Sequence, residues 1–112
     1  MTYKPGMVLR VPFPFVDSSE LKFRPALVLS SEAFNRKHAH VVFAMITTAK
    51  HTRWVSDVPI SSLDTAGLGV PSMIRFKLFT LDARLIAGSL GRLSPADWKA
   101  VRAQLNQILP GL

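Results

Sequence analysis

The chain has 112 residues, enough for one domain whose hydrophobic core needs no metal or disulfide to hold it together. It contains no cysteine, which excludes disulfides and thiolate metal sites and gives no indication of secretion. The formal net charge of +7 favours a polyanionic partner such as nucleic acid, or an acidic protein, although solubility alone could also explain it. The first residues lack the apolar run of a signal peptide and no later run could span a bilayer, so we expect a cytoplasmic protein without membrane contact.

A first strand is predicted over about Met7 to Phe15, because apolar residues recur at every second position from Met7. Pro12 and Pro14 remove backbone donors on one side, so the end of this strand should form a sheet edge or leave the sheet. The polar loop from Val16 to Phe23 follows at that place. A loop beside an unpaired edge is a common location for functional residues.

The second strand is predicted over about Arg24 to Ser30. The four apolar residues in a row after Pro25 indicate burial on both faces. An arginine at the start of such a strand lies where the core meets solvent, and its planar fork of donors fits phosphate well. After a turn or short helical segment at 31–37, the apolar pattern predicts a third strand over Val41–Ile46 that ends in two threonines.

The second half of the chain is predicted to alternate short strands with polar turns. In chain order we expect a basic loop at 50–54, a short strand at 57–60, a polar turn region at 61–68, a long strand at 72–81 that could contain a bulge, and a short strand at 85–90. Arg75 and Lys77 would lie on one face of the long strand.

A C-terminal helix has the clearest local pattern. Ser94 suits the N-cap, Pro95 the first helical position, and Asp97 the third, as in a variant capping box. Apolar residues then recur at helical spacing and give one stripe, made of Trp98, Val101, Leu105, Ile108 and Leu109. The pattern predicts a mainly β fold with a C-terminal helix, a small and partly open barrel forming a single domain over residues 1–112.

Antiparallel pairing of the second and third strands would bring Arg24 and Thr47 or Thr48 together at one end of the sheet. The groups gathered there would be an arginine for phosphate, hydroxyl donors, carboxylates and a basic rim, supplied by Arg24, Thr47, Thr48, Asp17, Glu20, Lys22, Lys50 and Arg53. Such groups can stabilise charge on a phosphorane and move protons around it. The pattern therefore indicates a phosphate-handling site.

Structural interpretations of the same residues remain open. Arg24 could form a surface ion pair with Glu20 or Asp17, and threonines at a strand end are often only strand formers. Trp54 could be a platform for base stacking or part of the core. His51 lies in the basic loop and could contact RNA, transfer protons or simply face solvent.

Metal and cofactor sites are not predicted. His38 and His40 could share a strand face, but no third ligand is spaced to complete a metal site. The sequence also contains no glycine-rich phosphate loop, no nucleophile elbow and no HExxH motif.

Segments along nearly the whole chain resemble, in order, the MazF/PemK family, the toxins of bacterial type II toxin–antitoxin pairs. They are Pro5–Val8, Pro12–Phe15, Arg24–Ser30, Ile46–Thr47, Pro71–Arg75, Thr80–Asp82 and Gly91–Ser94 with the terminal helix. The arginine–proline–apolar strand with its preceding loop is the most specific of these.

The resemblance implies an SH3-like barrel, usually a homodimer, and a metal-independent endoribonuclease that cuts single-stranded RNA at short sequences. The ribose 2′-hydroxyl would attack the adjacent phosphate and leave a 2′,3′-cyclic phosphate. Arg24 matches the family's catalytic arginine and Thr47 the threonine that binds the scissile phosphate. Further RNA contacts are expected from Asp17, Lys22, Thr48, Lys50, His51, Arg53, Arg75 and Lys77. The usual partner would be an acidic antitoxin, which a charge of +7 favours.

Two departures from the family pattern bear on mechanism. The loop from Val16 to Phe23 lacks the histidine or glycine-rich form of some members, and we assign the general base to Glu20 rather than Asp17 because its side chain is longer and nearer Arg24 in sequence. No acid follows Arg75, where some relatives have one. The alternatives are a protein of the same fold that poisons DNA gyrase, as CcdB-type proteins do, and a catalytically weak RNA-binding module.

Overall fold

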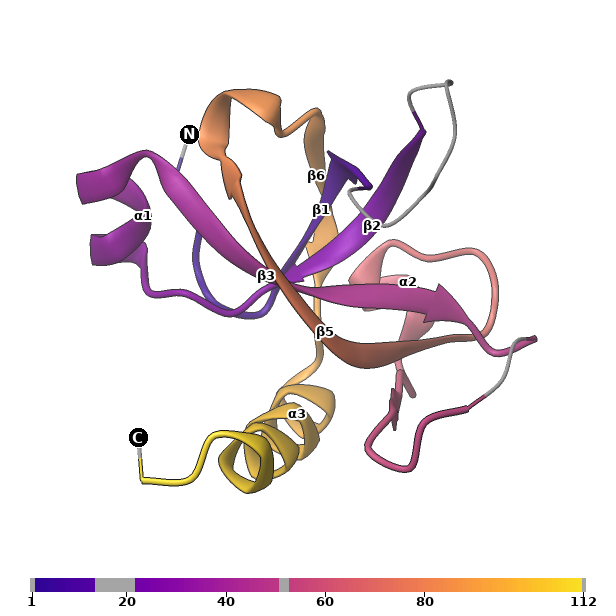
Figure 1. Cartoon of the computed structure of the whole chain (residues 1–112). Helices are drawn as coiled ribbons and strands as arrows, with labels where there is room; N and C mark the ends of the chain where they lie inside the picture. The colour runs from indigo at the N-terminus through magenta and orange to yellow at the C-terminus, as the bar shows by residue number, and fades with distance from the viewer. Residues whose placement is uncertain (1, 14–21, 51–52, 112) are drawn as a thin grey trace.

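In the computed structural model, the described residues are 2–13, 22–50 and 53–111. Their strands are β1 (Met7–Pro12), β2 (Phe23–Val28), β3 (His40–Thr48), β4 (Val58–Pro59), β5 (Ser72–Asp82) and β6 (Gly88–Arg92), and their helices are α1 (Glu32–His38), α2 (Leu63–Ala66), the 3₁₀ turn η1 (Ala83–Leu85) and α3 (Pro95–Ile108). Within these ranges the strands form one antiparallel sheet in the order β4-β5-β3-β2-β1-β6. The sheet curls into a half-barrel with α3 packed below it (Figure 1), which confirms the predicted architecture.

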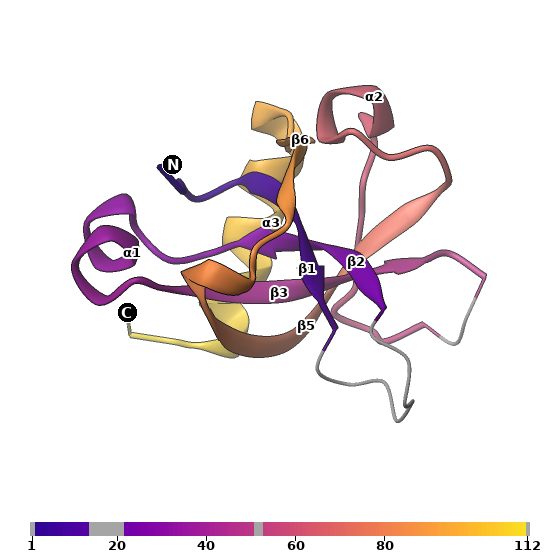
Figure 2. The ribbon, with the colours of Figure 1, turned by 90° about the horizontal axis from the view of Figure 1, so that it is seen from above.

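Hydrophobic clusters cover both faces of the curled sheet. One lies under α2 and α3 and includes Leu27, Ile74 and Val101, while the other includes Ala26, Val28 and Phe43. Successive residues of β2 therefore contribute to opposite clusters, as the uninterrupted apolar run predicted. Seen from above (Figure 2), α1 lies at the end of the sheet where β3 begins, and the segment after β3 lies at the opposite end.

The end of β1 is a sheet edge, as its prolines predicted. The Phe13 amide donates to the Lys22 carbonyl at 3.1 Å, so the nitrogen of Pro12 faces the other side of the strand. There β6 pairs with β1 only as far as Arg10. A missing donor at Pro12 consequently costs no ladder hydrogen bond. The predicted continuation to Phe15 lies outside the described residues.

The N-terminus of α3 supports a second element. The Ser94 hydroxyl caps the helix by accepting from the Asp97 amide at 3.2 Å. The Asp97 carboxylate accepts from the Ser61 and Ser62 amides and the Ser61 hydroxyl, at 2.6–3.1 Å. Burial raises the pKa of Asp97, but these hydrogen bonds outweigh it and leave the pKa below its usual range. Because Asp97 holds the start of α2 from outside, residues 61–68 contain a helical turn rather than the predicted polar turn alone.

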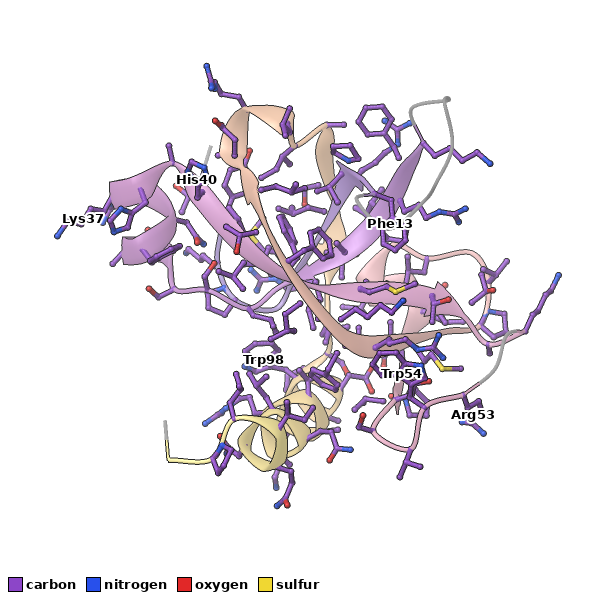
Figure 3. The ribbon with its side chains drawn as sticks, viewed as in Figure 1. Phe13, Lys37, His40, Arg53, Trp54 and Trp98 are labelled. Carbon is purple, nitrogen blue, oxygen red and sulfur yellow. The ribbon has the colours of Figure 1, made fainter. Side chains whose placement is uncertain are left out.

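The apolar stripe of α3 is shorter than predicted. Trp98 points from the helix toward the sheet (Figure 3), and Val101 and Leu105 pack against the same cluster. Ile108 and Leu109 are 37% and 38% exposed. The packed part of the predicted stripe therefore ends at Leu105, and Leu109 is already the C-cap of the helix.

The strand predicted at 85–90 begins later in the structure. The Asp82 carboxylate accepts from the Arg84 amide at 2.9 Å and starts the η1 turn, so that β6 is displaced to Gly88–Arg92. A Cβ on Gly91 would lie 2.3 Å from the Thr65 carbonyl oxygen. A side chain at this position would collide with the backbone of α2, so glycine is required where β6 passes α2.

Candidate functional site

The sheet register brings Arg24, Thr47 and Arg75 to one face. Ala26 pairs with Met45, and the same register extended by two residues places Arg24 opposite Thr47. On its other side, Met45 pairs with Arg75 of β5. Directly opposed residues, and residues two apart on a strand, point to the same face of a sheet. Arg24, Thr47 and Arg75 also line one pocket, which agrees with the predicted proximity of Arg24 and Thr47.

These side chains line a pocket of about 350 Å³ where β2 begins and β3 ends. Its polar groups come from Arg24, Thr47, Thr48, Ser72 and Arg75, and its apolar walls from Phe13, Pro25, Met45, Ile46 and residues 68–70. Cationic groups and hydroxyl donors thus converge on a concave surface, an arrangement suited to an anionic ligand.

Arg24 is exposed at the mouth of this pocket. Its guanidinium carbon lies 5.8 Å from the centre of the Phe13 ring, within the range of a cation–π contact. None of the carboxylates in 2–13, 22–50 and 53–111 forms an ion pair with it. Within those ranges its donors face no competing carboxylate, which suits the binding of phosphate.

Arg75 forms a buried ion pair in the pocket wall. Its Nε and Nη2 donate to the two oxygens of Asp57 at 3.1 and 2.8 Å, and the two side chains are 10% and 2% exposed. Burial raises the pKa of Asp57, but hydrogen bonds from Arg75 and the Trp54 amide lower it to a value below the usual range. The hydrogen bonds that Arg75 donates to Asp57 raise the pKa of Arg75 in turn. This ion pair holds the Arg75 guanidinium in one position in the pocket wall.

The other predicted site residues fall into two groups. Lys22, Lys50 and Arg53 are exposed cations that do not line the pocket, and the Lys77 ammonium lies 5.7 Å from the centre of the Trp54 ring. Asp17, Glu20 and His51 lie outside the described residues. The structure thus brings together Arg24, Thr47, Thr48 and Arg75 from the predicted set.

Sequence reasoning missed Asp57 and the segment 68–70. Asp57 meets Arg75 only through the β4–β5 pairing, and a separation of 18 residues carries no local signal. The segment 68–70 lines the pocket and follows α2, a helix that the sequence pattern did not predict. An acidic residue directly before a short strand was the one available indication.

The described ranges contain neither a candidate metal site nor a candidate membrane-spanning helix. Residues 2–13, 22–50 and 53–111 hold no group of three histidines, cysteines or carboxylates placed to bind a metal ion. No helix within them has the length and apolar character needed to cross a membrane.

Comparison with known proteins identifies the fold and the family. A family model described as the PemK-like, MazF-like toxin of type II toxin–antitoxin systems matches residues 4–109. Similar solved structures include MazF from Deinococcus radiodurans (21% identity, 97% of both chains covered, TM-score 0.76). Another is an endoribonuclease in complex with its cognate antitoxin from a mycobacterial species (22% identity, 96% of this chain and 93% of that one, TM-score 0.74). No curated protein matched the chain.

Proposed function

The chain belongs to the family of PemK-like, MazF-like toxins of type II toxin–antitoxin systems, and we propose that it is a metal-independent endoribonuclease that cleaves single-stranded RNA at short sequences. The observation that supports this activity is the pocket shared by Arg24 and Thr47. A guanidinium and a hydroxyl on one concave face can donate hydrogen bonds to the phosphoryl oxygens. Those oxygens gain negative charge as the phosphodiester approaches a phosphorane-like transition state.

The proposed reaction is an internal transfer within the RNA. The 2′-hydroxyl oxygen attacks the adjacent phosphorus, the bond from phosphorus to the 5′-oxygen breaks, and the products carry a 2′,3′-cyclic phosphate and a 5′-hydroxyl. Arg24 stabilises the charge that develops on the phosphoryl oxygens, and the Thr47 hydroxyl donates to one of them. A base must remove the 2′ proton and an acid must protonate the 5′-oxygen. Glu20 remains our proposal for the base.

Residues around the pocket are proposed to hold the rest of the strand. Exposed cations contact phosphates without regard to sequence, and this produces strong salt dependence. The exposed cations are Lys22, Lys50 and Arg53, and the proposed set also includes Lys77, the buried Arg75 and the residues Asp17, Thr48 and His51.

The partner is proposed to be an acidic antitoxin, and the assembly a homodimer. The chain carries a net charge of +7, which favours an acidic partner. Solved structures of two similar proteins, the mycobacterial endoribonuclease and Deinococcus radiodurans MazF, are complexes with their antitoxins. The cytoplasm, where RNA and a partner would be available, is the proposed location.

Cleavage of single-stranded RNA in EDTA tests the proposed activity. We expect the purified chain to cut RNA into fragments whose ends, mapped by mass spectrometry, carry a 2′,3′-cyclic phosphate. A DNA strand of the same sequence should stay intact, because it lacks the attacking hydroxyl. Uncut RNA in both EDTA and magnesium would refute the proposal.

The same assay separates the two alternatives. Growth arrest with intact RNA and trapped gyrase–DNA complexes would indicate a CcdB-type poison. Binding of RNA without cleavage in any buffer would indicate an RNA-binding module.

A further inference from the structure

Trp54 is an exposed aromatic residue held in a fixed turn beside the phosphate pocket. The residue is 42% exposed, and it belongs to neither hydrophobic cluster. The Trp54 amide donates to Asp57 Oδ2 at 2.8 Å, and the Asp57 amide donates back to the Trp54 carbonyl at 3.1 Å. Because Asp57 is itself held by Arg75, the position of Trp54 is set before any ligand arrives.

Two cations lie against the indole ring. The guanidinium carbon of Arg75 is 5.1 Å, and the ammonium of Lys77 5.7 Å, from the ring centre. Arg75 also lines the phosphate pocket, so the pocket and the ring are neighbours that share one side chain. Figure 3 shows Trp54 and Phe13 on the same side of the molecule, away from Lys37 and His40.

These contacts favour a role for Trp54 in binding single-stranded RNA over a role in the hydrophobic core. A tryptophan that serves the core is mostly buried, whereas Trp54 is exposed while its backbone is held by Asp57. Single-stranded RNA is bound by stacking its bases on aromatic faces while cations follow its backbone. Trp54, Arg75 and Lys77 supply both elements at the edge of a pocket that already suits a phosphate.

We propose that Trp54 is a base-stacking subsite for the RNA strand, which receives a nucleobase next to the phosphate bound by Arg24 and Thr47. This proposal rests on the proposed ribonuclease function. It adds a binding site for the RNA that flanks the cleaved phosphodiester. Stacking tolerates every base, so this contact contributes affinity and register more than sequence preference.

Binding of an uncleavable RNA tests the subsite. The probe is a 2′-O-methyl oligoribonucleotide of the cleaved sequence or, if no RNA is cut, of mixed sequence, because it lacks the attacking hydroxyl. Trp54→Leu, which keeps an apolar side chain but removes the ring, should weaken binding by about 5- to 150-fold. Trp54→Phe should recover most of the affinity. The matched control is Phe34→Leu, which changes an aromatic residue of similar exposure (38%) on α1, and it should bind as the wild type does.

An abasic scan locates the stacked base. Removal of one particular base should abolish the difference between wild type and Trp54→Leu, whereas removal of the others should leave it. If Trp54→Leu and the wild type bind RNA with equal affinity and melt at the same temperature, the subsite proposal is overturned. Cleavage of RNA by the wild type would still support the nuclease function in that case. Unchanged RNA affinity with weakened binding of an acidic peptide would also overturn it and identify a protein contact.

Discussion

Replacing Arg24 by alanine should lower the rate of RNA cleavage by about 10²–10³-fold, the loss typical of removing one donor that stabilises transition-state charge. Arg24 and Thr47 line the same pocket, where the phosphoryl oxygens would bind. The melting temperature should stay close to that of the wild type, because none of the described carboxylates pairs with Arg24. Single-turnover cleavage of a short RNA measures the rate.

Arg10→Ala is the matched control for this loss. Arg10 is exposed on β1, next to β2, and its guanidinium lies 4.5 Å from the Phe23 ring centre, much as Arg24 lies over Phe13. Val11 is the direct partner of Arg24, so Arg10 points to the other face of the sheet. Equal losses in the two variants would show an effect of total charge and would contradict the role of Arg24.

Replacing Asp57 by alanine should destabilise the fold by about 3–5 kcal/mol, because it leaves the buried Arg75 charge without its partner. For a domain of this size we expect the melting temperature to fall by at least about 10 °C. The variant also removes the acceptor for the Trp54 amide. Thermal unfolding followed by circular dichroism measures the change.

Asp82→Ala provides the comparison for Asp57. Asp82 and Arg84 form an ion pair with the same 2.8 Å separation, but the Arg84 side chain is 88% exposed. Hydrogen bonds from Arg84 hold the pKa of Asp82 at about 2. Water screens this pair, so its removal should change the melting temperature much less than Asp57→Ala does. Similar losses would show that burial does not determine the contribution of Asp57.

The contribution of Asp57 should depend on pH in one direction. Its pKa in the folded chain is lowered, below the value of about 3.9 for an unfolded aspartate. Asp57 therefore stabilises the fold fully above about pH 4, and this contribution disappears as pH falls through the folded-state pKa. The stability difference between wild type and Asp57→Asn should shrink below pH 4. A difference that grew under acid would contradict the lowered pKa.

The elements that could be predicted were those specified by local pattern. Each of these patterns determines the structure of its own segment. They are the apolar run of β2, the Ser94–Pro95 start of α3 and the prolines at the end of β1. The meeting of Arg24 and Thr47 needed only one further assumption, that two strands pair in antiparallel fashion. This is why the pocket could be located before its shape was known.

What could not be predicted depends on contacts between distant segments. Asp97 holds the start of α2 across 36 residues, and Asp57 reaches Arg75 only after β4 pairs with β5. The sequence placed Asp97 in a capping box and Asp57 in a short strand. In the folded chain, Asp97 binds Ser61 and Asp57 binds Arg75. The roles of Glu20, Asp17 and His51 stay predictions, since these residues lie outside the described ranges.

The most direct measurement is a crystal structure of the chain with a short single-stranded RNA that carries a 2′-deoxyribose at the cleaved position. We expect the phosphate that follows this sugar to lie in the pocket, within hydrogen-bond distance of both the Arg24 guanidinium and the Thr47 hydroxyl. A strand whose uncut phosphate binds elsewhere on the sheet, with neither residue in contact, would contradict the shared phosphate site.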